Sequence, residues 1–260
     1  MCTGDRDRLR HDSLARQRHR RRRDEPALTT DFIAETGSTN ADLLARVANG
    51  SARDGDWLVA ERQTDGRGRL GREWRSPDGN FYGSTLVAVE RGGPPPATLA
   101  LIAGIAIHGA LSRYTPGLTL KWPNDVLAGR AKIAGVLLER SGDWVVIGAG
   151  VNLVNHPDLP DRPSTDLATL GALISPRDFA SALADEMATS VARWRHQPFA
   201  VTVAAWQAAA HPIGTALDAA LPDGERIAGK FDGLTVEGAL RLRLPSGEVR
   251  AIHAGDVFQV

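Results

Sequence analysis

The stretch DGRGRLGR, Asp65–Arg72, holds the residues best suited to grip an anion. Arg67, Arg69 and Arg72 alternate there with glycines. Guanidinium groups bind phosphate or carboxylate oxygens through paired N–H donors, and glycine lets a backbone lie close to a ligand. We predict a loop that is disordered when empty and ordered over a polyphosphate or an acyl-phosphate. On spacing alone, a solvated surface loop fits equally well.

Gly66, Gly68 and Gly71 also spell G-x-G-x-x-G, a pattern of dinucleotide-binding turns. Such a turn leads into a helix whose N-terminus faces the pyrophosphate. Here REWRSPDGN follows, and its proline and glycine argue against a helix start. The Gly-Lys-Ser/Thr end of a Walker loop and the partner motifs of a kinase glycine loop are also missing. The segment is therefore interpreted as an anion-binding flap, a name kept below for Asp65–Arg72.

Only three lysines occur among 31 basic residues, and two of them stand in short motifs. KWPND begins with Lys121 and brings the side chains of Trp122, Asn124 and Asp125 to the end of a predicted strand. A trans-proline turn there can hold the amide and the carboxylate inward. A carboxylate beside phosphates normally needs Mg²⁺ between them, so Asp125 is a candidate metal or catalytic contact. A core position explains Trp122 equally well.

KIAG, which contains Lys132, and GAGVN, which ends at Asn152, place small residues next to a lysine and an amide. Gly135, Gly148 and Gly150 leave room for a ligand against the backbone. The amide of Asn152 can read the edge of a base. Taken singly, a surface lysine and glycines of a bulge or a close contact explain these motifs as well.

The elements that position these groups are strands interspersed with helices. Residues 29–50 predict a strand, a turn and a helix, which Ser38 or Thr39 can cap. From His211 onward, short alternating strands with glycine-bearing turns predict a small β-barrel. Between these segments the sequence predicts strands over 56–64, 80–90 and 143–153, two strands within 119–140 joined near Gly129, and helices over 96–114, 176–195 and 200–209.

Composition is ordinary for a soluble globular protein, with 42% hydrophobic and 24% charged residues. No apolar run approaches the roughly 20 residues that cross a bilayer, and the N-terminus lacks the apolar segment of a secretory signal. The lone cysteine, Cys2, excludes an intramolecular disulfide. We therefore expect a cytoplasmic protein without a membrane partner.

Charge is unevenly distributed although the formal net charge is zero. The first 25 residues hold nine arginines against five acidic residues. Residues 1–28 predict a disordered Arg-rich arm, either a solvated tail or a segment that touches nucleic acid or another acidic surface. The remaining body is slightly acidic, which argues against a general nucleic-acid surface.

Taken in order, ETGSTN, ERQTDGRGRLGR, KWPND, KIAG and GAGVN resemble the motifs of biotin protein ligases (biotin–[acetyl-CoA-carboxylase] ligases). The motifs span about residues 31–152, and the C-terminal strands resemble the family's SH3-like domain. The resemblance implies an α+β catalytic domain like that of class II aminoacyl-tRNA synthetases. It would have a mixed sheet with helices mainly on one face and the pocket at the sheet centre. The expected parts are the arm (1–28), the catalytic domain (29–210) and a C-terminal barrel (211–260).

The resemblance implies an enzyme that joins biotin to AMP from ATP, with Mg²⁺, and passes the biotinyl group to a lysine of a biotin carboxyl carrier domain. Catalytic roles fall to Lys132, Arg67 and Asp125, with Asp125 also the candidate Mg²⁺ ligand and a candidate proton acceptor. The motifs match ligand-binding residues of the family at Ser38, Thr39, Asn40, Gln63, Gly66, Arg67, Gly68, Arg69, Arg72, Lys121, Trp122, Asn124, Lys132, Gly135, Gly148, Gly150 and Asn152.

Many bacterial relatives carry an N-terminal winged helix that binds an operator, and this sequence starts its catalytic part at about residue 30. We therefore expect a ligase without repressor function or specific DNA binding, and leave homodimerisation open. The nearest rival is a lipoate–protein ligase, which shares the fold but lacks the GRGRxGR loop. Two further rivals are a nucleic-acid-binding protein acting through the arm, and a biotin-sensing module, against which Lys132 and Asp125 argue.

Overall fold

The computed structural model describes residues 29–159 and 162–259, so the predicted Arg-rich arm, 1–28, lies outside the described residues. The chain builds a seven-stranded sheet first and a five-stranded sheet afterwards. No helix within the described ranges is long and apolar enough to cross a bilayer.

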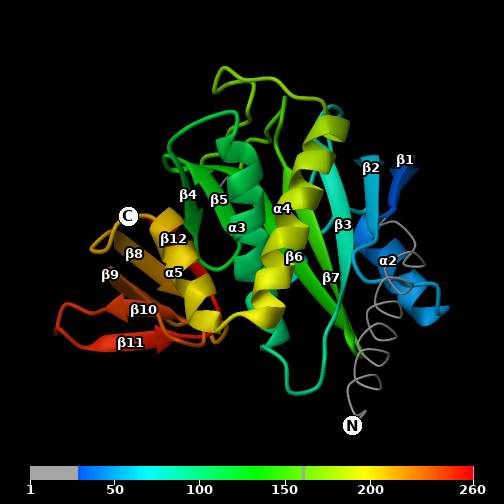
Figure 1. The fold of residues 1–260 in the computed structure, drawn as a ribbon. Coiled ribbons are helices and arrows are strands. Elements are labelled where there is room, and N and C mark those ends of the chain that lie inside the picture. The colour runs from blue at the N-terminus through cyan, green and yellow to red at the C-terminus, as the bar shows by residue number, and fades with distance from the viewer. Residues whose placement is uncertain (1–28, 160–161, 260) are drawn as a thin grey trace, which may run out of the picture.

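The larger sheet has the strand order β1-β2-β3-β7-β6-β5-β4 (Figure 1). Only β1 and β2 pair in parallel, and every other pair is antiparallel. The predicted mixed sheet is thus confirmed. Its strands are β1 (Thr30–Thr36), β2 (Trp57–Gln63), β3 (Phe81–Ala88), β4 (Leu118–Lys121), β5 (Asp125–Ala128), β6 (Ala131–Ser141) and β7 (Trp144–Val151).

Helices lie mainly on one face of this sheet, as predicted. The helices are α2 (Thr39–Ala48), α3 (Leu99–Ser112), α4 (Pro176–His196) and α5 (Phe199–Ala209), with 3₁₀ turns η1 (Arg69–Gly71) and η2 (Pro96–Thr98). In Figure 1, α3 and α4 cross the same face, and the apolar sequence of α3 follows from its burial between the sheet and α4. The opposite face carries α2, whose Leu43 packs against Leu58, Leu86 and Val146.

The start of α2 is fixed by its capping residue. Ser38 is the N-cap, and its side-chain oxygen accepts a hydrogen bond from the backbone N–H of Ala41 at 3.5 Å. The helix ends at Ala48, and Gly50 follows with a φ of +76° that favours glycine. These local signals place the segment after Ser38 against the centre of the sheet.

The KWPND segment folds differently from its prediction. The sequence predicts two strands within 119–140, but these residues contribute to three, because KWPND itself makes the turn between β4 and β5. Lys121 pairs with Asp125 across this turn. The Trp122–Pro123 peptide bond is cis, not trans as expected. A sequence alone does not fix this isomer, because proline weakens the usual trans preference.

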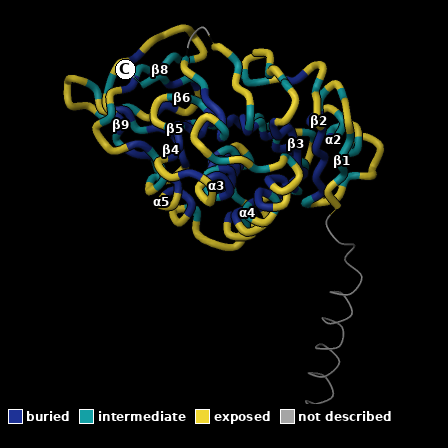
Figure 2. The backbone as a smooth tube through the Cα atoms, turned by 90° about the horizontal axis from the view of Figure 1, so that it is seen from above, coloured by how far each residue is buried: buried dark blue, intermediate teal, exposed yellow. Residues whose placement is uncertain are grey.

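The C-terminal sheet is antiparallel throughout, with the order β11-β10-β9-β8-β12. Its strands are β8 (Ala216–Ala220), β9 (Arg226–Leu234), β10 (Leu240–Arg243), β11 (Val249–Ile252) and β12 (Asp256–Gln259). It packs against α5 through Phe231, whose ring meets the rings of Trp206 and His211 edge to face. Figure 2 shows buried segments running through α3, β3, β5 and β6, so a continuous interior supports the centre of the larger sheet.

Candidate active site

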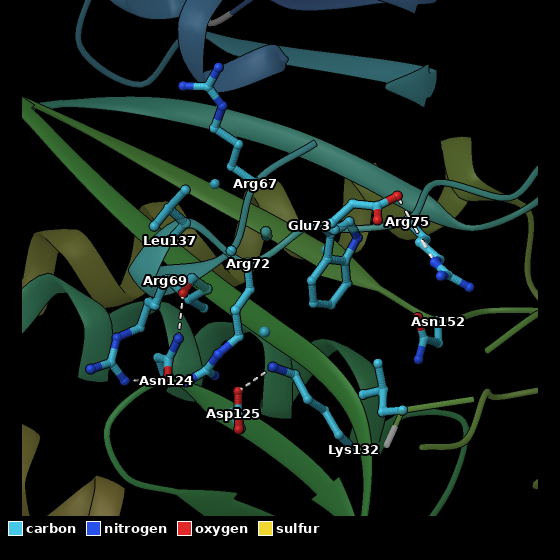
Figure 3. Close-up of a pocket in the computed structure, with 18 of the residues that line it drawn as sticks. Arg67, Arg69, Arg72, Glu73, Arg75, Asn124, Asp125, Lys132, Leu137 and Asn152 are labelled. Atoms are coloured by element: carbon cyan, nitrogen blue, oxygen red, sulfur yellow. Dashed lines mark hydrogen bonds and ion pairs between the residues drawn. The ribbon is translucent and has the colours of Figure 1, made fainter. Parts of the chain in front are cut away.

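A cavity of about 270 Å³ opens over the centre of the larger sheet, beside the flap (Figure 3). Its walls come from the start of α2, the flap, the β4–β5 turn, β6, β7, the loop after β7 and the start of β12. Every predicted site residue except Gly66 lines this cavity. Gly66 instead allows two backbone segments to lie close together, because a Cβ there would lie 2.5 Å from the carbonyl oxygen of Trp74.

Asp125, the first residue of β5, gathers three cations. Its Oδ1 lies 2.6 Å from Nζ of Lys132, and its Oδ2 lies 2.9 Å from Nζ of Lys121 and 3.7 Å from Nη1 of Arg162. The Asp125 side chain is only 5% exposed, so water does little to screen these pairs. The cluster holds the ammonium of Lys132, which reaches in from β6, at a fixed point of the cavity wall.

Ionisation of this cluster follows from burial and from its opposite charges. Burial raises the pKa of the Asp125 carboxyl, but Lys132 and Lys121 outweigh it and hold that pKa well below its ordinary value. Burial lowers the pKa of Lys132, against the raising effect of Asp125, and the cations Lys121 and Arg162 lower it further. Asp125 is therefore an anion at neutral pH, and the cations beside it are drawn together by it.

Asp125 does not fit the predicted Mg²⁺ site. Both of its oxygens already face ammonium groups, which leaves a divalent cation in repulsive surroundings. Across residues 29–159 and 162–259, no group of three His, Cys, Asp or Glu side chains could hold a metal ion. Asp125 also makes a weak proton acceptor, because its pKa is lowered.

A buried polar network forms a second wall at the start of α2. The backbone N–H of Thr39 donates to Oε1 of Gln63 at 2.9 Å, and Oγ1 of Thr39 lies 2.6 Å from Oγ of Ser84. Ser84 donates to Oδ1 of Asn40 at 2.6 Å, and Nδ2 of Asn40 donates to Oε2 of Glu139 at 2.7 Å. Each group fixes the orientation of the next, so the wall offers preset donors and acceptors to a polar ligand.

Three glycines leave room on the cavity floor, but side chains of the protein itself take part of that room. Gly135 and Gly150 are neighbours across β6 and β7. A Cβ at Gly150 would lie 2.3 Å from Cε2 of Trp74, and one at Gly148 would lie 2.4 Å from Oδ1 of Asn40. The glycines therefore admit the indole and the amide, and the indole lies where the sequence predicted space for a ligand.

Trp74, two residues beyond the flap, covers the floor next to the charged cluster. Nζ of Lys132 lies 5.3 Å from the centroid of its ring, within the range of a cation–π contact. The indole nitrogen is buried and has no hydrogen-bond partner. A buried donor of this kind is costly, so a ligand that offers an acceptor here would remove the cost.

The flap is a short folded-back segment. The backbone N–H of Trp74 donates to the Gly66 carbonyl at 2.9 Å, and that of Gly68 donates to the Arg72 carbonyl at 2.7 Å. The 3₁₀ turn η1 forms its tip, where Leu70 has a φ of +57° and is 76% exposed. The structure thus gives one folded conformation of the flap, and its ordering by a ligand stays a prediction.

The three flap arginines have different surroundings. Arg67 forms an ion pair of 2.5 Å with Asp65, and both side chains are more than 60% exposed. In Figure 3, Arg67 points away from Asp125 and Lys132, whereas Arg69 extends toward Asn124 and Arg72 toward Asp125. All three arginines line the cavity, but only Arg69 and Arg72 make contacts across it in this conformation.

Arg69 and Arg72 connect the flap to the β4–β5 turn and to the C-terminal sheet. Arg69 donates to Oδ1 of Asn124 at 3.2 Å and to the carbonyl of Gly255 at 3.0 Å. Arg72 forms an ion pair with Asp256. Burial lowers the pKa of Arg69. These contacts close one side of the cavity with groups that are far apart in the sequence.

Trp122 and Asn152 line the cavity, but their polar groups bond elsewhere. Nε1 of Trp122 donates to the carbonyl of Gly238 in the turn between β9 and β10 at 3.1 Å, so the indole is held at the junction of the two sheets. Nδ2 of Asn152 donates to the carbonyl of Thr165 at 3.0 Å. Both residues thus support the cavity wall as well as facing it.

Among the cavity and second-wall residues that were not predicted from the sequence, five make the contacts described above. They are Trp74, Ser84, Glu139, Arg162 and Asp256. A polar residue inside the apolar strand NFYGSTLVAVE could have drawn attention to Ser84. The other four carry no comparable signal, because their role depends on strand register and on the packing of distant loops.

Comparison with known proteins matches two parts of the chain to two different domains of biotin ligases. The biotin/lipoate A/B protein ligase family matches residues 33–152, and the biotin protein ligase C-terminal domain matches residues 219–259. A biotin–[acetyl-CoA-carboxylase] ligase of Paracoccus denitrificans is 37% identical over 87% of this chain and 99% of its own length. One of Mycobacterium tuberculosis is 38% identical over 88% of both chains.

Solved structures agree with these matches. The biotin protein ligase of Aquifex aeolicus, in complex with biotin and ATP, superimposes with a TM-score of 0.78 at 26% identity, over 89% of this chain and 99% of the other. Such a fold, together with relatives above 30% identity over nearly their full length, is decisive for the family. The chain belongs to the biotin protein ligase family.

Proposed function

We propose that this protein is a biotin–protein ligase that forms biotinyl-5′-AMP and transfers the biotinyl group to a carrier lysine. The observation that carries this proposal is the cavity itself, where one wall holds clustered cations and another a buried hydrogen-bond network. Biotin has both a charged carboxylate and a polar ring, and these two walls are suited to one end each. The solved Aquifex relative binds biotin and ATP, which supports the same ligands here.

In the first step, a carboxylate oxygen of biotin bonds to the α-phosphorus of ATP, and the bond from that phosphorus to the leaving pyrophosphate breaks. Two anions must approach each other, so positive groups aimed at the developing charge give most of the acceleration. We assign this task to Lys132, with Arg69 and Arg72 of the flap beside the phosphates. Asp125 acts through Lys132 by fixing the ammonium at 2.6 Å.

The ring of biotin carries a urea group that both donates and accepts hydrogen bonds. Thr39 and Asn40 line the cavity with a hydroxyl and an amide group, and Gln63, Ser84 and Glu139 fix the orientation of these groups. Such preset groups reject a ligand that lacks matching polar atoms, because the buried groups would then lose partners. This network favours biotin over lipoate, whose dithiolane ring has no urea.

In the second step, the amine of a carrier lysine attacks the acyl carbon, the bond from that carbon to the phosphate oxygen breaks, and AMP leaves. The amine must be neutral to attack and loses a proton in the reaction. Asp125 is not assigned as its acceptor, because its carboxylate is held by two lysines and its pKa is lowered. The flap keeps the reactive anhydride away from water until the carrier arrives.

The proposed partner is a biotin carboxyl carrier domain of acetyl-CoA carboxylase, after the names of the curated relatives. A cytoplasmic location is proposed with it. Mg²⁺ is proposed as the companion of ATP, held through the phosphates, since Asp125 is unsuited to bind it.

Isotope exchange between pyrophosphate and ATP tests this function, because it requires only the first step. We expect exchange with biotin and none above background with lipoate. Incubation of the full chain with ATP, biotin and a carrier domain should then add one biotinyl group to the carrier, measured by mass. Exchange with lipoate alone would refute the proposal and favour the lipoate–protein ligase.

A further inference from the structure

The flap is fastened to the C-terminal sheet by Asp256, the first residue of β12. Arg72 forms an ion pair with this carboxylate, and Nη1 of Arg69 lies 3.4 Å from its Oδ1. The Asp256 side chain is 12% exposed, against 63% for Asp65, the partner of Arg67. Water therefore screens the contacts of Asp256 far less than an ordinary surface ion pair.

The backbone before Asp256 is shaped for the same contact. Gly255 has a φ of +150°, and its carbonyl accepts a hydrogen bond from Nη2 of Arg69 at 3.0 Å. A Cβ at this position would lie 2.6 Å from the carbonyl oxygen of Ala220. Glycine is thus needed to present the carbonyl and the following carboxylate to one guanidinium group.

The same strand also holds the end of β4 and the turn between β5 and β6. Nζ of Lys121 donates to the carbonyl of Val257 at 2.9 Å, and Arg130 donates to the carbonyl of Gln259 at 2.6 Å. Lys121 is one of the two lysines that pair with Asp125. The edge of the C-terminal sheet therefore ties the flap and the charged cluster to one rigid support.

Like charges on the flap need a counter-charge when no phosphate is bound. Arg69 and Arg72 lie three residues apart on the turn η1 and would repel each other without one. We propose that Asp256 is a positioning residue, through which the C-terminal domain holds these two arginines over the cavity and sets how long the adenylate is retained. Adenylate retention rests on the proposed function, whereas closure of the flap does not.

Limited trypsin digestion of the full chain without ligands tests flap closure directly, because trypsin cleaves after Arg69 and Arg72. Replacing Asp256→Asn should raise cleavage within the flap about tenfold, since hydrogen bonds to a charged partner are lost and cleavage follows the open population. Asp232→Asn is the matched control: this residue is 13% exposed, pairs with two arginines in the same sheet, and does not touch the flap. Cleavage after Arg226 serves as the internal reference.

A second readout follows the intermediate: biotinyl-AMP released to solution per carrier modified. It should rise several-fold in Asp256→Asn and return toward normal in Asp256→Glu, which restores the carboxylate. A general loss of folding would raise cleavage after Arg226 as well and would overturn the proposal. Flap cleavage in Asp256→Asn equal to that in Asp232→Asn would also overturn the proposal, as would a decrease in the biotinyl-AMP that Asp256→Asn releases per carrier modified. If the wild-type protein shows no pyrophosphate–ATP exchange, the proteolysis still tests whether Asp256 holds the flap closed.

Discussion

Lys132 illustrates how one side chain depends on its neighbours for a defined position. A lysine has a long, flexible stem, and ordering it costs conformational entropy. The pair with Asp125 and the ring of Trp74 restrict it to one region of the cavity wall. Asp125 is in turn fixed by Lys121, so the geometry of the reacting carboxylate and phosphate depends on a chain of three paired charges.

We predict that Lys132→Ala lowers the rate of pyrophosphate–ATP exchange by about 10²- to 10³-fold, the usual effect of removing one charge-stabilising donor. The variant leaves Asp125 paired with Lys121, so the fold should persist. Lys230→Ala is the control, because Lys230 is exposed on β9 and should leave exchange within about twofold of wild type. A near-normal rate in Lys132→Ala would remove this residue from its proposed role.

Residues that stand in contiguous motifs could be predicted, and those that meet only in the folded chain could not. KWPND and KIAG each carry several polar or small residues together, so Lys132 and Asp125 were visible in the sequence. Trp74 was not, because its position depends on two glycines, Gly135 and Gly150, being opposite each other in β6 and β7. The pairing of Asp125 with two lysines, which argues against its predicted role as Mg²⁺ ligand, could not be foreseen, since those lysines lie on separate strands.

At the scale of elements, the sheet floor and the flap are matched to each other. The indole of Trp74 lies against Gly150 on β7. A Cβ at Gly150 would lie 2.3 Å from Cε2 of that indole, so the position of the indole requires glycine here. Strand positions could be predicted from alternation, but the split of residues 119–140 into three strands could not. Polar residues at a strand end look the same whether the chain stops or turns back.

We predict that Gly150→Ala displaces Trp74 and opens the flap, seen as faster tryptic cleavage after Arg69 and Arg72. Overpacking of this kind costs about 1–3 kcal/mol. In a Trp74→Ala background the added methyl group has room, and Gly150→Ala should produce no further increase. Gly37→Ala is the control, because a Cβ there meets nothing within 4 Å. Equal increases in both backgrounds would show that the two residues act independently.

Arg67 must change partner if it is to contact the adenylate as the family resemblance implies. Its pair with Asp65 is exposed and screened by water, so Arg67 can swing inward at little cost. We predict that Arg67→Ala raises released biotinyl-AMP per carrier modified several-fold but changes biotin affinity without ATP by less than about twofold. Arg62→Ala, with similar exposure and one carboxylate partner, should change neither quantity. An unchanged amount of biotinyl-AMP released per carrier modified in Arg67→Ala would count against its role in the flap.

At the scale of the whole molecule, the C-terminal sheet is part of the site as well as an attached domain. Asp256, Val257 and Gly255 reach residues that precede them by more than 130 positions. The sequence predicted a separate small barrel, and it offered no sign that an edge strand of that barrel would complete the cavity. Long-range contacts of this kind follow from how two sheets dock, which local patterns do not specify.

His211, between α5 and β8, gives the junction of the two sheets a dependence on pH. It is 4% exposed, and its ring meets Phe231 at a centroid distance of 4.5 Å. Burial, and to a smaller extent Lys121, lowers the pKa of His211 to about 4. The unfolded chain takes up the proton near pH 6.5, so the stability contributed by the neutral ring is complete above that pH and is lost as pH falls toward 4.

We predict that the free energy of unfolding falls by about 3 kcal/mol from this group as pH drops from 6.5 to 4. His211→Gln removes the titrating ring and should flatten that part of the stability–pH curve, even if it lowers stability at pH 7. His108→Gln is the matched control, because this histidine lies outside the junction and contacts the carbonyl of Leu118. Urea unfolding at several pH values measures the slopes, and an unchanged slope in His211→Gln would show that other groups set the acid sensitivity of the junction.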